Sequence, residues 1–242
     1  MKARTRTHLY ASRIHKWLAI IVGVQLLLWF TSGALMSFLP IDRVHGDHLV
    51  DRKTIDALPA GTPLLNPASY LSGVAGPVES VTIHMQLGRP IAEVTTRSGT
   101  RLFDAASGIT LGATDRQKAE RIARAAWRGK GHPAVVIDRV LVESPEYRGP
   151  LPAWRVGFAD GDATRVFVAE ETGRITAVRT GTWRLYDFFW GLHIMDWKNH
   201  ADFNTPWLLG FALGGFALWI GGAVLLYMRW PVRRRSVQRS VM

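Results

Sequence analysis

The sequence predicts an α+β membrane protein in which two transmembrane helices flank a folded domain. Two apolar segments, residues 18–39 and 207–227, are each about 20 residues long, which is the length of a helix that spans a bilayer. Between them, short segments of alternating hydrophobicity are separated by glycine-containing turns, a pattern typical of β-strands. Both ends of the chain are basic, which is typical of segments that flank membrane spans.

The positive charge indicates the orientation of the two spans. The formal net charge of the chain is +11. Five lysine or arginine residues precede residue 17, five follow residue 227, and neither tail contains an acidic residue. The positive-inside rule places both tails in the cytoplasm. We therefore expect a bacterial inner-membrane protein with a periplasmic central domain. No nucleic-acid partner is expected, because the basic residues flank the spans and form no separate patch.

The first span is predicted to be a retained anchor. It is longer than the apolar region of a typical secretory signal, and no A-x-A cleavage site follows it before Pro40. The chain has no cysteine, which excludes disulfides, thiolate metal sites and covalent c-type haem attachment. The predicted organisation is a basic tail (1–16), the first span (17–39), a periplasmic domain (40–182), an interfacial helix with a loop (183–205), the second span (206–228) and a second basic tail (229–242).

The central domain is predicted to be built from strands with one helix. Residues 41–67 are expected to form a loop, because Asp, Gly and Pro recur there and periodicity is weak. Residues 115–127 have helical spacing, with Thr114 as the expected N-cap. The predicted strands are residues 78–86, 89–96, 100–104, 135–141, 153–159, 164–169 and 174–179.

The domain contains an internal similarity. The segments that begin at Arg89 and at Leu151 both consist of a strand, a glycine turn, a second strand, a small or acidic residue, a glycine and a third strand. This similarity predicts two copies of one small α+β unit packed as a pseudo-repeat. Two unrelated hairpins are the alternative.

The second span is introduced by an aromatic segment and carries a stripe of small residues. After Gly181, seven aromatic side chains precede Pro206, a pattern typical of an interfacial helix before a span. Within the span, small residues recur on one face, which permits close packing against the first span or against another copy of the chain. These residues are Gly210, Gly214, Ala217 and Gly221. In the first span, Gln25, Thr31 and Ser32 are polar, and the hydroxyls are expected to bond carbonyls of their own helix.

Histidines lie at both faces of the predicted membrane region. His15 precedes the first span, and His193 and His200 precede the second. Imidazole is the usual axial ligand of electron-transfer haem. A helix of about 20 residues separates its ends by roughly 30 Å, so His15 and His193 cannot ligate one iron. The alternatives are a juxtamembrane surface residue for His15 and a plain interfacial aromatic belt around His193.

Three parts of the chain resemble the PepSY-associated transmembrane family. They read RIHKWLAIIVGVQLLLWFTSGALMSFLPIDRVHGDHL, LPAWRV followed by TRVFVAEETGRI, and WRLYDFFWGLHIMDWKNHADFNTPWLL. The resemblance implies a periplasmic PepSY-like domain tied to the inner membrane, and it implies similarity to haem-containing reductases of ferric iron or ferric siderophores. Larger members of the family have four spans, so a chain with two spans is expected to form a homodimer.

The resemblance and the histidines together predict a haem protein. We expect non-covalent haem b, two per dimer, with His15 paired with its copy and His193 with its copy. Electrons from an external quinol, flavin or reductase would reach ferric iron or a ferric siderophore in the periplasm. The chain would also contact membrane lipid. The rival functions are a non-enzymatic PepSY binding or regulatory module and an accessory subunit of an iron-uptake system.

Further candidate residues are expected near the periplasmic surface. His200 could replace His193 as the haem ligand, or it could form a ferric-iron site with Asp196 and Asp202. A solvated loop is the alternative to that iron site. His48 is a weaker metal candidate, and Arg184 is a candidate partner of haem propionates or of lipid headgroups. His84 and His132 are expected to be surface residues. No hydrolase or nucleotide-binding motif is present in the sequence.

Overall fold

The computed structural model describes residues 2–52 and 58–229; the side chains of residues 2–12, 14–15 and 224–229 are not described. The side chain of His15 and most of the predicted C-terminal tail therefore lie outside the described residues. The chain divides into two compact units. The helical unit comprises residues 1–36 and 189–242, and the sheet unit comprises residues 37–188.

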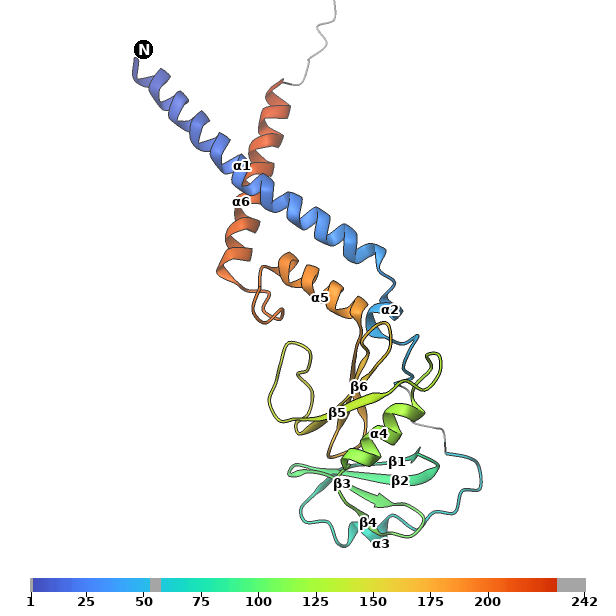
Figure 1. The fold of residues 1–242 in the computed structure, drawn as a ribbon. Helices are drawn as coiled ribbons and strands as arrows, with labels where there is room; N and C mark the ends of the chain where they lie inside the picture. Colours follow the sequence, from blue (N-terminus) through green and yellow to red (C-terminus); the bar gives the residue numbers. More distant parts are fainter. Residues whose placement is uncertain (1, 53–57, 230–242) are drawn as a thin grey trace, which may run out of the picture. The chain divides into compact units, whose positions relative to one another are not determined.

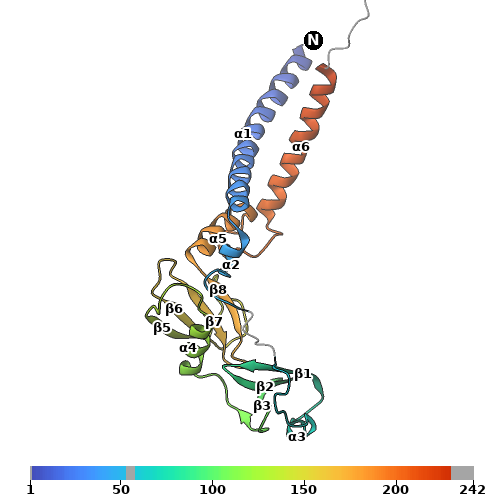
Figure 2. The same ribbon diagram turned by 90° about the vertical axis from the view of Figure 1, so that its right-hand side faces the viewer.

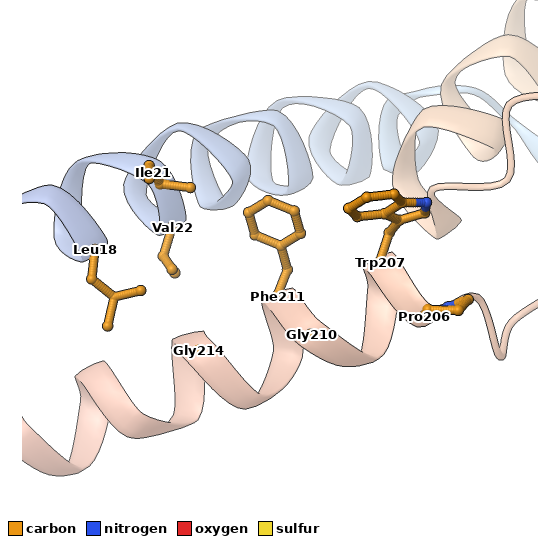
Figure 3. A pocket seen from close by; sticks show the side chains of 8 residues that line it. All are labelled: Leu18, Ile21, Val22, Pro206, Trp207, Gly210, Phe211 and Gly214. Atoms are coloured by element: carbon orange, nitrogen blue, oxygen red, sulfur yellow. The ribbon is translucent and has the colours of Figure 1, made fainter.

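The helical unit is built from three helices. Helix α1 (Lys2–Phe38) and helix α6 (Pro206–Arg229) cross in the view of Figure 1 and run side by side in Figure 2, and a Cβ at Gly214 of α6 would lie 3.2 Å from Val22 Cγ2 of α1 (Figure 3). Residues 189–194 of α5 (Gly181–Ile194) belong to the same unit. Two segments, Lys16–Phe38 and Pro206–Ala223, are long and apolar enough to cross a membrane. The two predicted spans are thus confirmed as apolar helices. Pro206 begins α6, where its missing N–H removes no helical hydrogen bond.

The sheet unit contains two four-stranded antiparallel sheets, with strand orders β1-β2-β3-β4 and β5-β6-β7-β8 (Figure 1). Each sheet is therefore a meander in chain order. The first comprises β1 (Val78–Gln86), β2 (Arg89–Thr96), β3 (Gly99–Asp104) and β4 (Thr110–Leu111). The second comprises β5 (Val135–Val140), β6 (Ala153–Phe158), β7 (Arg165–Ala169) and β8 (Ile175–Arg179).

One helix precedes each sheet and packs on one of its faces. Tyr70 of α3 (Ala68–Leu71) packs with Val94 and Phe103 of the first sheet. Ile122 of α4 (Arg116–Ala125) packs with Val166 of the second. Both halves of the unit therefore consist of a helix followed by a four-stranded meander, and the predicted pseudo-repeat is confirmed at the level of topology.

Two local predictions are wrong. The segment expected to be a loop begins with helix α2 (Ile41–His45), which is a single turn and too short to show periodicity. Gly46 ends it at a φ of 77°, and a Cβ at Gly46 would lie 2.7 Å from Val178 Cγ1. The N-cap of α4 is Asp115, whose side chain accepts the Lys118 N–H at 2.7 Å. Thr114 is instead buried, and its N–H bonds the Glu170 carbonyl.

The prediction that His84 lies at the surface is also wrong. Its residue is only 3% exposed, and Nδ1 has no hydrogen-bond partner among the described residues. Strand alternation places it opposite the Tyr70 face of the first sheet. On this side a salt bridge joins the two sheets, because Arg174 Nε donates to Glu93 Oε2 at 2.8 Å. Burial, followed by the charge of Arg174, lowers the pKa of His84. The other histidine expected at the surface, His132, is exposed as predicted.

Candidate functional site

His193 lies in the last turn of α5, where the chain leaves the helix. The helix ends at Ile194, and the next residue, Met195, has a left-handed φ of 55°. A left-handed residue directly after the last helical residue is a common way of ending a helix. This ending fixes the direction in which the last turn of α5, including His193, meets α1 within the helical unit.

Three residues on one face of α1 contact His193. Trp29 Nε1 donates to the His193 carbonyl at 2.8 Å, and Ser32 Oγ lies 3.0 Å from His193 Nδ1. A Cβ at Gly33 would lie 3.5 Å from His193 Cε1, so the imidazole rests against the bare backbone of α1. Positions i, i+3 and i+4 share one face of a helix, which explains why all three residues reach His193.

The hydrogen bonds of the Ser32 hydroxyl indicate which ring nitrogen of His193 carries a proton. The Ser32 hydroxyl has one proton, and Ser32 Oγ lies 2.8 Å from the Leu28 carbonyl, which can only accept. Donation to this carbonyl, the ordinary helical back-bond, leaves Ser32 Oγ as the acceptor for His193. In the neutral imidazole, this arrangement assigns the proton to Nδ1 and leaves the lone pair on Nε2. Thr31 makes the same back-bond, to Leu27 at 2.8 Å, so the predicted bonding of both hydroxyls is confirmed.

His200 lies on a different side of α5. A Cβ at Gly191 would lie 2.5 Å from His200 Cδ2, so the His200 ring packs against the backbone at position 191. The His200 carbonyl accepts the Trp190 indole N–H at 3.2 Å. Residues two apart in a helix point in nearly opposite directions, so Gly191 and His193 face different ways. The side chains of His193 and His200 therefore do not face one another, and they would not hold one haem between them.

Asp196 organises the loop between α5 and α6. Its Oδ1 accepts the N–H groups of Lys198 and Asn199, at 3.3 and 3.1 Å. Its Oδ2 accepts those of Ala201 and Asp202, at 2.9 and 3.0 Å. These backbone hydrogen bonds hold the pKa of Asp196 well below its usual range. The carboxylate is thus committed to loop structure.

The structure does not gather metal-ligating side chains around His200, where the iron site was predicted. Among the described residues, no three His, Asp or Glu side chains gather as a metal-binding group. Asp202 Oδ1 accepts the Asn204 N–H at 2.8 Å, and both oxygens of Asp196 are already bonded. His48, the weaker metal candidate, has its Nε2 4.0 Å from Asp162 Oδ2.

Arg184 has a protein carboxylate as its partner. Its Nε donates to Glu146 Oε1 at 2.8 Å, and Arg165 NH1 donates to the other oxygen of Glu146 at 2.6 Å. Burial alone raises the pKa of Glu146, but the hydrogen bonds from the two arginines outweigh it and lower the pKa. A haem propionate or a lipid phosphate would have to compete with Glu146 for Arg184.

The two predicted haem-ligand positions lie far apart along α1. His15 is seventeen residues before Ser32, a separation of about 25 Å at the rise of an α-helix. Because Ser32 contacts His193, the site at His193 and position 15 mark two separate places on this helix.

Sequence reasoning missed the contacts of Trp29 and Gly33. Their spacing around Ser32 was the available signal, but nothing local connects them with a residue beyond position 180.

Comparison with known proteins identifies one relationship. A family model described as PepSY-associated TM region matches residues 12–242 of the chain. No curated protein and no solved structure matches it. The matched range includes both candidate spans, both sheets and the contacts between α1 and α5.

Proposed function

Because the chain belongs to the family of PepSY-associated TM regions, we propose that it is a b-type haem protein of a bacterial inner membrane. It passes electrons across the membrane to ferric iron or a ferric siderophore, and it acts as a homodimer. Both tails are cytoplasmic and the sheet unit is periplasmic. The observation that best supports this proposal is the orientation of the His193 imidazole by Ser32 on α1.

The residues at this position fit a haem ligand. An axial imidazole needs a free lone pair on one nitrogen and benefits from a hydrogen bond donated by the other. The neutral His193 ring has both features in the tautomer assigned above, in which Nδ1–H donates to Ser32 Oγ over 3.0 Å. Gly33 adds no side chain beside the ring, whose Cε1 would lie 3.5 Å from a Cβ there. Haem supplies one-electron chemistry when it is bound, and the protein supplies ligation, orientation and burial.

Each neighbouring residue has a definite task in this proposal. Ser32 keeps the proton on Nδ1, and Trp29 anchors the last turn of α5 through the His193 carbonyl. Asp196 holds the following loop in one conformation through four backbone N–H groups. Together these contacts fix where His193 Nε2 points without using that nitrogen.

A haem held by two imidazoles would require a second histidine beside His193, and the positions of the other histidines then favour a homodimer. In the helical unit, His200 is the one further histidine whose side chain is described, and it packs on a different side of α5. His15 lies about 25 Å along α1 from Ser32. His193 of a second chain would supply the second imidazole, since a C2 axis brings identical residues of two chains together. His15 pairs with its own copy in the same way.

Electron transfer across a sealed bilayer tests the proposed function. The full chain is placed in proteoliposomes loaded with haem and with a trapped reductant, and a ferric chelate is added outside. Formation of ferrous iron outside is followed with a chromogenic ferrous chelator. We expect reduction that depends on the protein and is lost in His193→Ala, but retained in His132→Ala, an exposed histidine of the sheet unit. Equal rates with and without the protein would overturn the proposal.

A further inference from the structure

Glu146 joins three elements of the sheet unit at one point. It lies in the loop between β5 and β6, and its side chain is 23% exposed. Its Oε1 accepts the Nε–H of Arg184 at 2.8 Å, and its Oε2 accepts from Arg165 at 2.6 Å. Its backbone carbonyl accepts the Nε–H of Arg179 at 2.7 Å. Since these arginines belong to α5, β7 and β8, one residue ties the start of α5 to the second sheet.

The loop that carries Glu146 is itself held in place. The neighbouring Tyr147 is fully buried, and its ring stacks on Phe167 with the centroids 4.6 Å apart. The Tyr147 hydroxyl lies 2.9 Å from Thr176 Oγ1. None of these contacts involves the Glu146 carboxylate. A substitution that only removes the charge of Glu146 therefore leaves the buried anchor of the loop intact.

The first turn of α5 is fixed against the same sheet. Thr180 Oγ1 accepts the Trp183 N–H at 3.1 Å, as the side chain of an N-cap does. The guanidinium of Arg179 lies 4.2 Å from the centroid of the Trp183 ring. Arg184 is the next residue, and among the described residues Glu146 is the only carboxylate with which it forms an ion pair. The Glu146–Arg184 pair thus completes the attachment of this end of α5.

The opposite end of α5 carries His193. Helix α5 begins in the sheet unit and ends in the helical unit, where Trp29 and Ser32 contact His193. Arg184 and His193 are nine residues apart, which is about 13.5 Å along an α-helix. A continuous hydrogen-bonded helix of this length turns and shifts as one body, so a displacement at one end reaches the other.

We propose that Glu146 is a positioning residue for His193, which acts through Arg184 and α5 to set the direction of His193 Nε2. The inference rests on the proposed function, in which this nitrogen binds haem. Removing the charge of Glu146 leaves Arg165 and Arg184 side by side without the carboxylate that both of them bind. Two neighbouring guanidinium groups with no anion between them repel one another. Arg184 then leaves its place, and the first turn of α5 is released.

Hydrogen exchange of the full chain in detergent, without added haem, tests the coupling. Glu146→Gln keeps the shape of the side chain and removes its charge. We expect the amide protection of residues 189–194 to fall about tenfold in this variant. Glu93→Gln is the matched control, because Glu93 also binds an arginine and its side chain is 13% exposed. Its partner Arg174 precedes β8 instead of lying in α5, so we expect unchanged protection of residues 189–194.

A double-substitution cycle shows whether Glu146 acts through Arg184. We expect Arg184→Gln to lower the protection of residues 189–194 as Glu146→Gln does, and the combined variant to lose no more than either alone. Additive losses would show that the two residues act independently and would overturn the inference. Equal protection of residues 189–194 in Glu146→Gln and Glu93→Gln would overturn it as well.

Haem-loaded samples separate this inference from the proposed function. The electron paramagnetic resonance signal of oxidised low-spin haem depends on the orientation of its axial imidazole planes, and we expect it to shift in Glu146→Gln but not in Glu93→Gln. Lost protection of residues 189–194 in a protein that binds no haem would keep the positioning role and overturn the haem proposal. Haem-replete Glu146→Gln with unchanged signal and protection would overturn the positioning role and leave the haem proposal standing.

Discussion

Two histidines in different parts of the molecule show what distinguishes a candidate ligand from a packed side chain. His84, between the sheets, is 3% exposed, and its Nδ1 has no partner among the described residues. His193, at the junction of α5 and α1, is half-buried, and its Nδ1 is bonded to Ser32. Burial alone disfavours the charged form of the ring. A hydrogen bond from a neighbouring helix also assigns the proton to one nitrogen and orients the other, which is what a metal ligand needs.

Removing the two imidazoles should give the largest contrast. We expect His193→Ala to abolish reduction of external ferric chelate in proteoliposomes, because the proposed haem ligand is removed. The corresponding change in the sheet unit, His84→Ala, should leave reduction largely intact, because that ring lies between the sheets. Ferrous iron formation per reconstituted protein is the measurement. Loss of activity in His84→Ala, with retention in His193→Ala, would invert the assignment of roles.

The Ser32 hydroxyl should have the next largest effect. Ser32→Ala retains the imidazole and removes the acceptor of Nδ1–H, which for hydrogen-bond partners of metal ligands typically costs about 10- to 100-fold in affinity. Haem titration of the haem-free protein, followed by absorbance, measures this affinity. Thr31→Ala is a matched control, because Thr31 makes the same back-bond one residue earlier. Identical haem affinity in the two variants would show that Ser32 does not orient His193.

The ion pair beside His84 should matter for stability. The side chains of Glu93 and Arg174 are 13% and 37% exposed, so we expect Glu93→Ala to destabilise the sheet unit by about 2 kcal/mol, after allowance for solvent screening. The exposed pair Glu79–Arg97 provides the control, and Glu79→Ala should change stability by less than about 0.5 kcal/mol. Denaturant unfolding of the purified chain compares the two variants. Equal losses would show that burial of the first pair is unimportant.

The buried His84 should give the smallest effect, a dependence of stability on pH. Its folded pKa lies below the unfolded value, so the unfolded chain binds the proton more readily. Its contribution to stability is therefore complete above the unfolded pKa, about 6.5, and is lost as pH falls toward the folded pKa. We expect the unfolding midpoint to fall less between pH 7.5 and pH 5 in His84→Leu than in the parent chain. A slope unchanged by the substitution would exclude this role.

The sequence predicted regular elements better than contacts between them. Strands β1 and β2 were predicted with their observed bounds, because their alternation ends at glycine-containing turns. Helix α2 was missed because a single turn has no period to detect. The burial of His84 was missed because alternation assigns a residue to a face but does not say that a second sheet covers it.

The candidate site was only partly predictable for a related reason. The histidines and Ser32 are recognisable as polar groups beside or within an apolar segment. Ser32 and His193 are 161 residues apart, however, and their contact depends on how α5 ends against α1. The roles of Trp29 and Gly33 follow from the same packing. Such contacts between distant elements require the three-dimensional structure.

The absorption spectrum of the detergent-purified protein, before and after dithionite, tests the central claim most directly. Two histidine pairs per dimer predict sharp α and β bands of low-spin haem b in the reduced protein, with about one haem per chain. Half that content would leave only one histidine pair in use. A colourless protein purified from haem-replete cells would contradict the account and would return His193 to a purely structural role beside Ser32.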